Sequence, residues 1–200
     1  MLNAAAIVIA DVHARRIAAA RKGGQVYLPE RAPDRDDGRL GGQAQQIPKP
    51  ALGAAPSRTA AFMDAALAAA FEELGMLVAR PARVRAAPTR EAEGWDRMRL
   101  HGLEPDRGAL VYLGRAMTPP GDAPRRHVRV FAAPWSAVTN SLMRPAGADR
   151  TLWLEPQAFE DRIGDAALAT FGPRALTALQ RGAAPIRVSF RQGRRLEHAL

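Results

Sequence analysis

The sequence has no cysteine in its 200 residues. This excludes disulfide staples, thiolate metal sites and thiol nucleophiles, and it fits a reducing compartment, so we expect a cytoplasmic protein. Long apolar runs are also missing. The stretch 4–10 is too short to cross a membrane, follows no basic residue and runs into Asp11, so we expect a strand there and no membrane association.

Lysine is nearly absent as well. Lys22 and Lys49 are the only two, so the net charge of +9 comes almost entirely from arginine. Arginine pairs well with phosphate, which makes a small phosphorylated molecule a candidate partner. The arginines are spread along the chain without a helix-turn-helix, RNA-binding or zinc-finger pattern, so nucleic-acid binding is not expected. The oligomeric state stays unknown at this level.

Hydrophobic periodicity and turn residues predict a mixed α/β chain. The clearest helix covers 58–74, which contains no glycine or proline, with Ser57 as a candidate N-cap and Gly75 as its end. Expected strands cover 4–10, 25–28, 109–117, 126–133, 151–154 and 186–190, and further helices cover 91–100, 156–163 and 165–181, the last broken at Gly172-Pro173. Residues 29–56 are rich in proline, glycine, aspartate and glutamine and show no sustained period, so we expect an irregular insertion there. Nothing in the pattern indicates a second core, so we expect a single domain over 1–200.

A short motif lies at the end of the predicted helix. Residues 72–76 read E-E-L-G-M and resemble the end of the Nudix signature, G-x5-E-x7-R-E-U-x-E-E-x-G-U. The segment 24–29, G-Q-V-Y-L-P, followed by Asp34 and Asp37, resembles the start of the insertion found in coenzyme A diphosphatase-like Nudix proteins. Similar stretches follow in the same order: G-L-x-P-D at 102–106, T-P-P-G at 118–121 and R-x-F at 129–131. The order and spacing of these pieces carry the resemblance.

The resemblance implies a fold, a chemistry and a set of residues. The fold is a Nudix-type α/β/α sandwich around a mixed sheet, and the reaction is hydrolysis of a nucleoside diphosphate or coenzyme A type substrate with Mg²⁺ or Mn²⁺. Glu72 and Glu73 match the glutamates that bind metal and carry catalysis in the family. Apart from the resemblance, Arg125, Arg126 and Arg129, at the start of and along the predicted strand 126–133, are candidates for binding the substrate phosphate, and the alternative is a solvated strand face.

The motif is degenerate where its chemistry needs it most. Ala68 and Ala69 stand at the R-E positions, and Glu30 and Arg31 replace two glycines of the subgroup pattern. At about 100° per residue, position 69 lies about 40° around the helix from Glu73 and about 60° from Glu72, so the three are expected to share a face. Asp64 lies about 180° from Glu73 and is not expected to replace the missing carboxylate.

Three functional hypotheses remain open at this level. The first is a Nudix-fold protein with a degraded box helix and weak or no hydrolysis. The second is an active Mg²⁺- or Mn²⁺-dependent diphosphatase that uses Glu72, Glu73 and one carboxylate from the loop, namely Glu30, Asp34, Asp36 or Asp37. The third is a basic, non-catalytic module that binds an anionic partner and needs no metal.

Overall fold

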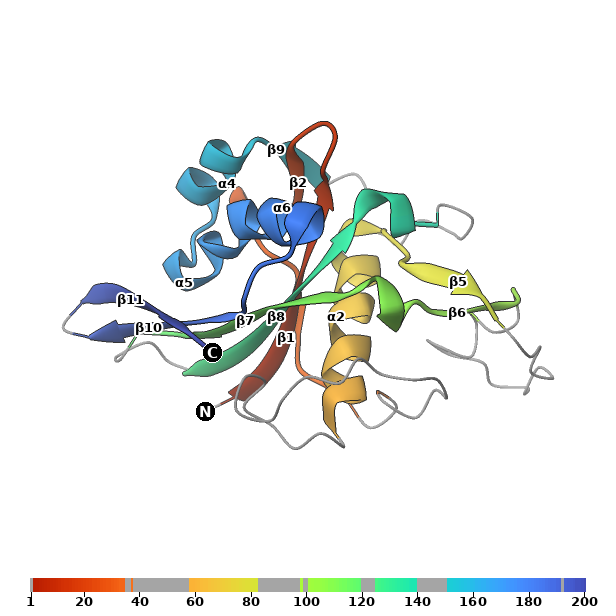
Figure 1. Ribbon diagram of the computed structural model, residues 1–200, viewed down its shortest axis with the longest axis horizontal. Coiled ribbons are helices and arrows are strands. Elements are labelled where there is room, and N and C mark those ends of the chain that lie inside the picture. The colour runs from red at the N-terminus through yellow and green to blue at the C-terminus, as the bar shows by residue number, and fades with distance from the viewer. Residues whose placement is uncertain are drawn as a thin grey trace.

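The computed structural model describes residues 2–34, 37, 58–82, 98, 101–119, 125–139, 151–191 and 193–200. Within them, a large mixed sheet lies between two helical layers (Figure 1). The α/β/α sandwich expected from the sequence is confirmed. None of the described helices has the length and apolar character needed to cross a membrane.

The sheet is centred on β1 (Leu2–Asp11), which pairs in parallel with β8 (Arg126–Pro134) along nearly its whole length. Along the other edge of β1, β2 (Arg16–Lys22) and β4 (Glu30–Arg31) each pair antiparallel with part of the strand. The remaining strands of the sheet are β3 (Gln25–Tyr27), β7 (Val111–Met117), β9 (Thr151–Leu154), β10 (Ile186–Arg191) and β11 (Arg194–Ala199), in the order β11-β10-β7-β8-β1-β2-β3 with β9 on β2. A separate two-stranded sheet joins β5 (Ala79–Pro81) to β6 (Leu103–Pro105).

Side chains alternate across β1 and supply both cores. Ala6 and Val8 pack toward the layer formed by α4 (Pro156–Arg162), α5 (Ala166–Ala169) and α6 (Phe171–Arg181). Ile7 and Ile9 face α2 (Thr59–Leu74) on the opposite side. A strand buried on both faces reads as a continuous apolar run. This is why the sequence alone located β1.

Helix α2, which carries the motif at 72–76 at its end and is called the box helix below, packs closely on the sheet because small residues meet at the contact. Its buried residues include a run of alanines, and alanines of β1 and β2 join the same cluster. Gly75 ends the helix in the left-handed conformation, with φ at 68°. The Gly75 amide donates to the Phe71 carbonyl at 3.0 Å and the Met76 amide to the Ala70 carbonyl at 3.2 Å, which closes the last turn. The glycine of the motif therefore has a structural role.

Several boundaries differ from the prediction. The N-cap of α2 is Arg58, which makes no side-chain cap hydrogen bond, and the expected cap Ser57 lies outside the described residues. The break before α6 comes at Thr170, because Gly172 and Pro173 fit into the first turn of that helix, where proline is tolerated. The helix expected over 91–100 falls almost entirely outside the described residues.

Other elements were missed by the sequence analysis. Strand β2 is rich in alanine, which has little intrinsic preference for strands, and it becomes a strand through its pairing with β1, β3 and β9. Strands β5, β6 and β11 were also not predicted. Strand β4 lies at the start of the expected irregular insertion and pairs with Ala5 and Ala6, so that segment begins as part of the sheet.

Candidate functional site

The C-terminal end of α2 meets the segment 24–31, so two of the resembling stretches lie together. The Tyr27 hydroxyl on β3 donates a hydrogen bond to Oε2 of Glu73. Nη1 of Arg31 on β4 donates to Oε1 of Glu72 at 2.8 Å. Both predicted metal-binding glutamates therefore hold protein partners.

Arg31 is the centre of a wider ionic group. Its Nη2 bonds to Oδ2 of Asp37 at 2.9 Å and also to Asp34. The side chain of Asp37 is fully buried, whereas that of Glu72 is 52% exposed. Burial lowers the pKa of the Arg31 guanidinium, but Asp37, Glu72 and Asp34 outweigh it and hold that pKa above its usual value. A permanent protein cation thus sits among three carboxylates, in the segment where the subgroup has glycine.

The alanines at the R-E positions do not share the surroundings of the glutamates. Ala69 is completely buried and belongs to the apolar cluster of Ile7, Ile9 and Phe131, and Ala68 is 6% exposed. Position 69 keeps the angular relation to Glu72 and Glu73 that helix geometry predicts, but it lies about one turn earlier, where it is buried in the apolar cluster. The helix lies so close to the sheet that position 69 is covered, and solvent reaches α2 only near its start, at Ala60 and Ala61, and in its last turn.

The residues as arranged do not fit a divalent metal. Mg²⁺ and Mn²⁺ require several oxygen ligands free to turn toward one point. Here Glu72 is bonded to a guanidinium, Glu73 to a phenol, and the third ligand position carries a methyl group. Within the part of the chain that the structure describes, no three acidic or histidine side chains are grouped to hold a metal ion.

Asp64 has a structural role. It is wholly buried, and Arg107 makes two bonds to it, from Nε to Oδ1 and from Nη2 to Oδ2, each 2.7 Å long. This bidentate pair joins the middle of α2 to the short helix Arg107–Ala109 before β7. The structure agrees with the expectation that Asp64 does not substitute for a box carboxylate. No sequence pattern pointed to Arg107 as its partner.

The three predicted phosphate-binding arginines are not brought together. Arg125 is exposed just before β8. Arg126 bonds to Glu30 and, at 2.8 Å, to Oδ2 of Asp165. Arg129 is 3% exposed and lies on the side of the sheet that packs against α2, with its guanidinium 4.3 Å from the centre of the Phe62 ring.

The candidate loop carboxylates also have protein partners where the structure describes them. Glu30 bonds to Arg126 of β8, and Asp34 and Asp37 bond to Arg31. Asp36 lies outside the described residues.

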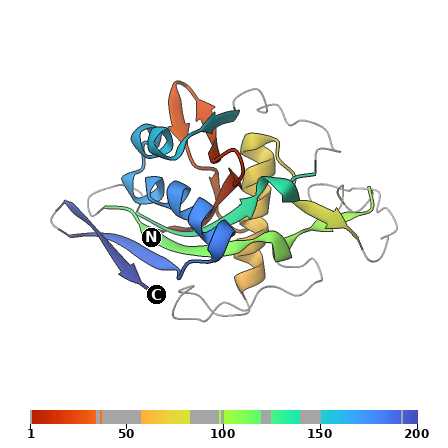
Figure 2. The same cartoon turned by 45° about the horizontal axis from the view of Figure 1, so that its top comes forward.

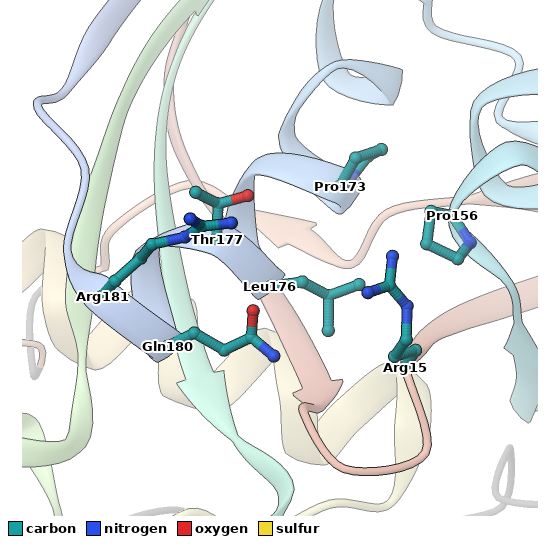
Figure 3. Close-up of a pocket in the computed structure, with 7 residues that line it drawn as sticks. All are labelled: Arg15, Pro156, Pro173, Leu176, Thr177, Gln180 and Arg181. Atoms are coloured by element: carbon teal, nitrogen blue, oxygen red, sulfur yellow. The ribbon is translucent and has the colours of Figure 1, made fainter.

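A surface cavity of about 170 Å³ lies in the other helical layer (Figure 3). It is lined by Arg15 from the turn between β1 and β2, by Pro156 of α4, and by residues of α6 that include Thr177, Gln180 and Arg181. None of the predicted site residues lines it. The cavity is therefore separate from the end of α2.

Comparison with known proteins identifies the fold. No protein-family model and no curated protein matches the chain. Among solved structures, a NUDIX hydrolase from Alicyclobacillus acidocaldarius matches with a TM-score of 0.63 and 21% identity, over 90% of this chain and 95% of that one. The NUDIX domain of Shewanella oneidensis NrtR, solved with ADP ribose, aligns with a TM-score of 0.42 and 10% identity, over 90% and 88%. The structure thus has the fold of the Nudix hydrolases.

Proposed function

We propose that this Nudix-fold protein hydrolyses nucleoside diphosphate and coenzyme A type substrates weakly or not at all at its box helix. One observation carries the proposal. Arg31 extends from β4 and bonds to Glu72, the carboxylate that the family resemblance assigns to metal binding. A guanidinium here supplies positive charge to the end of α2 without a metal.

A guanidinium cannot replace the chemistry of a metal ion. In metal-dependent hydrolysis the cation holds a water molecule, lowers its pKa and polarises the phosphoryl group. Arginine offers only N–H donors and stays protonated, so it neither binds a water oxygen as a Lewis acid nor accepts a proton. The arrangement supports charge balance and ligand binding at this end of the helix better than it supports turnover.

A second candidate function has one observation in its favour. Asp34 and Asp37 approach Glu72 through the same guanidinium, so the loop does bring carboxylates to the end of α2. Three carboxylates around one guanidinium leave an excess of negative charge, which favours a further cation. An active diphosphatase using Glu72, Glu73 and a loop carboxylate would need these groups to leave Arg31 and Tyr27 and turn toward one metal ion.

Chromatographic detection of the cleavage products separates the two candidates, because hydrolysis of the diphosphate in ADP-ribose or coenzyme A yields two phosphomonoesters and no free phosphate. ADP-ribose, coenzyme A and ADP would each be incubated with the wild-type protein and with Glu72→Gln and Glu73→Gln, in Mg²⁺ and in Mn²⁺. We expect the three proteins to give the same low rate, because neither glutamate supports turnover. Glu104→Gln is the matched control, since Glu104 bonds to Arg80 on the separate two-stranded sheet. Wild-type turnover that both box-helix changes abolish, and the control does not, would establish the diphosphatase instead.

A further inference from the structure

Three arginines lie side by side across the sheet. Arg129 on β8 is the register partner of Arg115 on β7, and Arg115 is in turn the partner of Arg187 on β10. Adjacent strands are about 5 Å apart, so neighbouring side chains of this row start close together. On β11, His198 stands opposite Arg187 and extends the row to the edge of the sheet.

The row lies on the face that α2 covers. Arg129 contacts Phe62 of α2. Phe131, two residues further along β8 and therefore on the same face of the sheet, belongs to the hydrophobic cluster that includes α2. A register shift between Tyr112 and Gly114 brings Arg115 to this face. Gly114 makes the shift possible: its φ is 136°, and a Cβ there would lie 1.9 Å from the Ile186 carbonyl oxygen. The irregularity in β7 therefore builds the row.

His127 adds a buried polar group two residues before Arg129. It is 9% exposed, and its Nε2 has no hydrogen-bond partner. Nε of Arg115 and Nε of Arg187 are also buried without a partner. Burial, together with Arg129 and Arg115, lowers the pKa of His127 to about 4, so its imidazole is neutral at pH 7. A neutral imidazole can still donate one hydrogen bond.

Such a row is costly unless something balances it. Like charges directly opposite one another destabilise a sheet, and buried polar atoms without partners cost free energy. Arg129 donates to Oδ1 of Asn3 at 2.6 Å and to the His127 carbonyl at 3.2 Å, so among the described residues of this group the atoms left without a partner are Nε of Arg115, Nε of Arg187 and Nε2 of His127. An anion is the partner that would satisfy Arg115 and Arg187, because arginine binds phosphate oxygens with charge-assisted hydrogen bonds.

We propose that Arg115, Arg187 and His127 form a binding site for a phosphate or diphosphate group of a small molecule. His127 is buried, so a polymer backbone could not reach it, whereas Arg115 and Arg187 are half buried and can meet a small ligand. The β10–β11 hairpin that carries Arg187 projects from one edge of the molecule in both views (Figures 1 and 2).

This site is separate from the box-helix carboxylates. Phe62, which contacts Arg129, precedes Glu72 by ten residues of α2, a rise of about 15 Å along the helix. The site therefore does not depend on whether the end of the helix hydrolyses anything. It also gives the arginine surplus seen in the sequence one specific use.

Titration calorimetry with inorganic pyrophosphate tests the proposal. We expect saturable binding to the wild-type protein, weakened at least about tenfold by Arg115→Ala and by Arg187→Ala. Arg191→Ala is the matched control, because Arg191 lies on the same strand at its exposed end, and it should change the affinity less than about twofold. ADP tests whether a nucleotide supplies the phosphate, and it should lose affinity in the same variants.

His127→Leu separates a binding role from a structural one. Removing an unpaired buried polar group should leave the urea midpoint unchanged or raised, while pyrophosphate binding weakens. The proposal would be overturned by wild-type protein that shows no saturable binding, or by equal losses in Arg191→Ala and Arg187→Ala, which would mean diffuse charge. It would also be overturned by a single-stranded oligonucleotide that binds tightly through the same residues while pyrophosphate does not.

Discussion

Replacing Arg107 with alanine is expected to lower the free energy of unfolding by about 3 to 5 kcal/mol. The change leaves Asp64 buried with neither of its two 2.7 Å bonds to the guanidinium. A buried carboxylate without its cation is strongly unfavourable, because its negative charge is then neither paired with a guanidinium nor solvated by water. Urea denaturation monitored by circular dichroism measures the effect.

The matched control for this prediction is Arg80→Ala. Arg80 bonds to Glu104 at 2.8 Å, but its side chain is 40% exposed, so that ion pair should contribute at most about 1 kcal/mol. Replacing both partners of the buried pair, as Arg107→Met with Asp64→Leu, should recover much of the stability lost in Arg107→Ala. If Arg107→Ala costs no more than Arg80→Ala, the pair does not anchor α2.

Ala69→Glu is expected to destabilise the protein by several kcal/mol instead of restoring a metal site. The family pattern places a glutamate here, and helix geometry alone would group it with Glu72 and Glu73. In the structure, however, Ala69 is completely buried against Ile7 and Ile9. The introduced carboxylate would either lose its hydration in an apolar core or force α2 away from the sheet.

Ala61→Glu on the same helix is the control for this second prediction. Ala61 is partly exposed, so the same substitution should change the urea midpoint little. The two variants differ only in where the carboxylate lies, and helix propensity affects both alike. Equal midpoints, together with tighter Mn²⁺ binding by Ala69→Glu, would show that position 69 can open toward the site.

The sequence located the fold through a few strong local signals. β1 was found because both its faces are buried, and α2 because its ends and its uninterrupted length are clear. Strands β2 and β11 were missed because alanine and arginine side chains carry little strand preference, and pairing with neighbours decides their conformation.

The candidate site was only partly predictable for a similar reason. The motif located Glu72 and Glu73, but their partners Arg31 and Tyr27 lie more than forty residues earlier in the chain. Helix geometry fixed the angles between positions 69, 72 and 73 and could not show how closely the sheet covers the first of them. The row of Arg115, Arg129 and Arg187 depends on strand register and on an irregularity at Gly114, which no local pattern reveals.

The central claim is that Arg31 takes the place of a metal at the end of α2, and a manganese titration followed by electron paramagnetic resonance tests it most directly. The account predicts weak Mn²⁺ binding by the wild-type protein that Glu72→Gln does not change. It predicts that Arg31→Ala tightens binding about tenfold or more, because Glu72, Asp34 and Asp37 lose their guanidinium, and that adding Glu72→Gln to Arg31→Ala removes the gain. Tight wild-type binding that Glu72→Gln abolishes would contradict it.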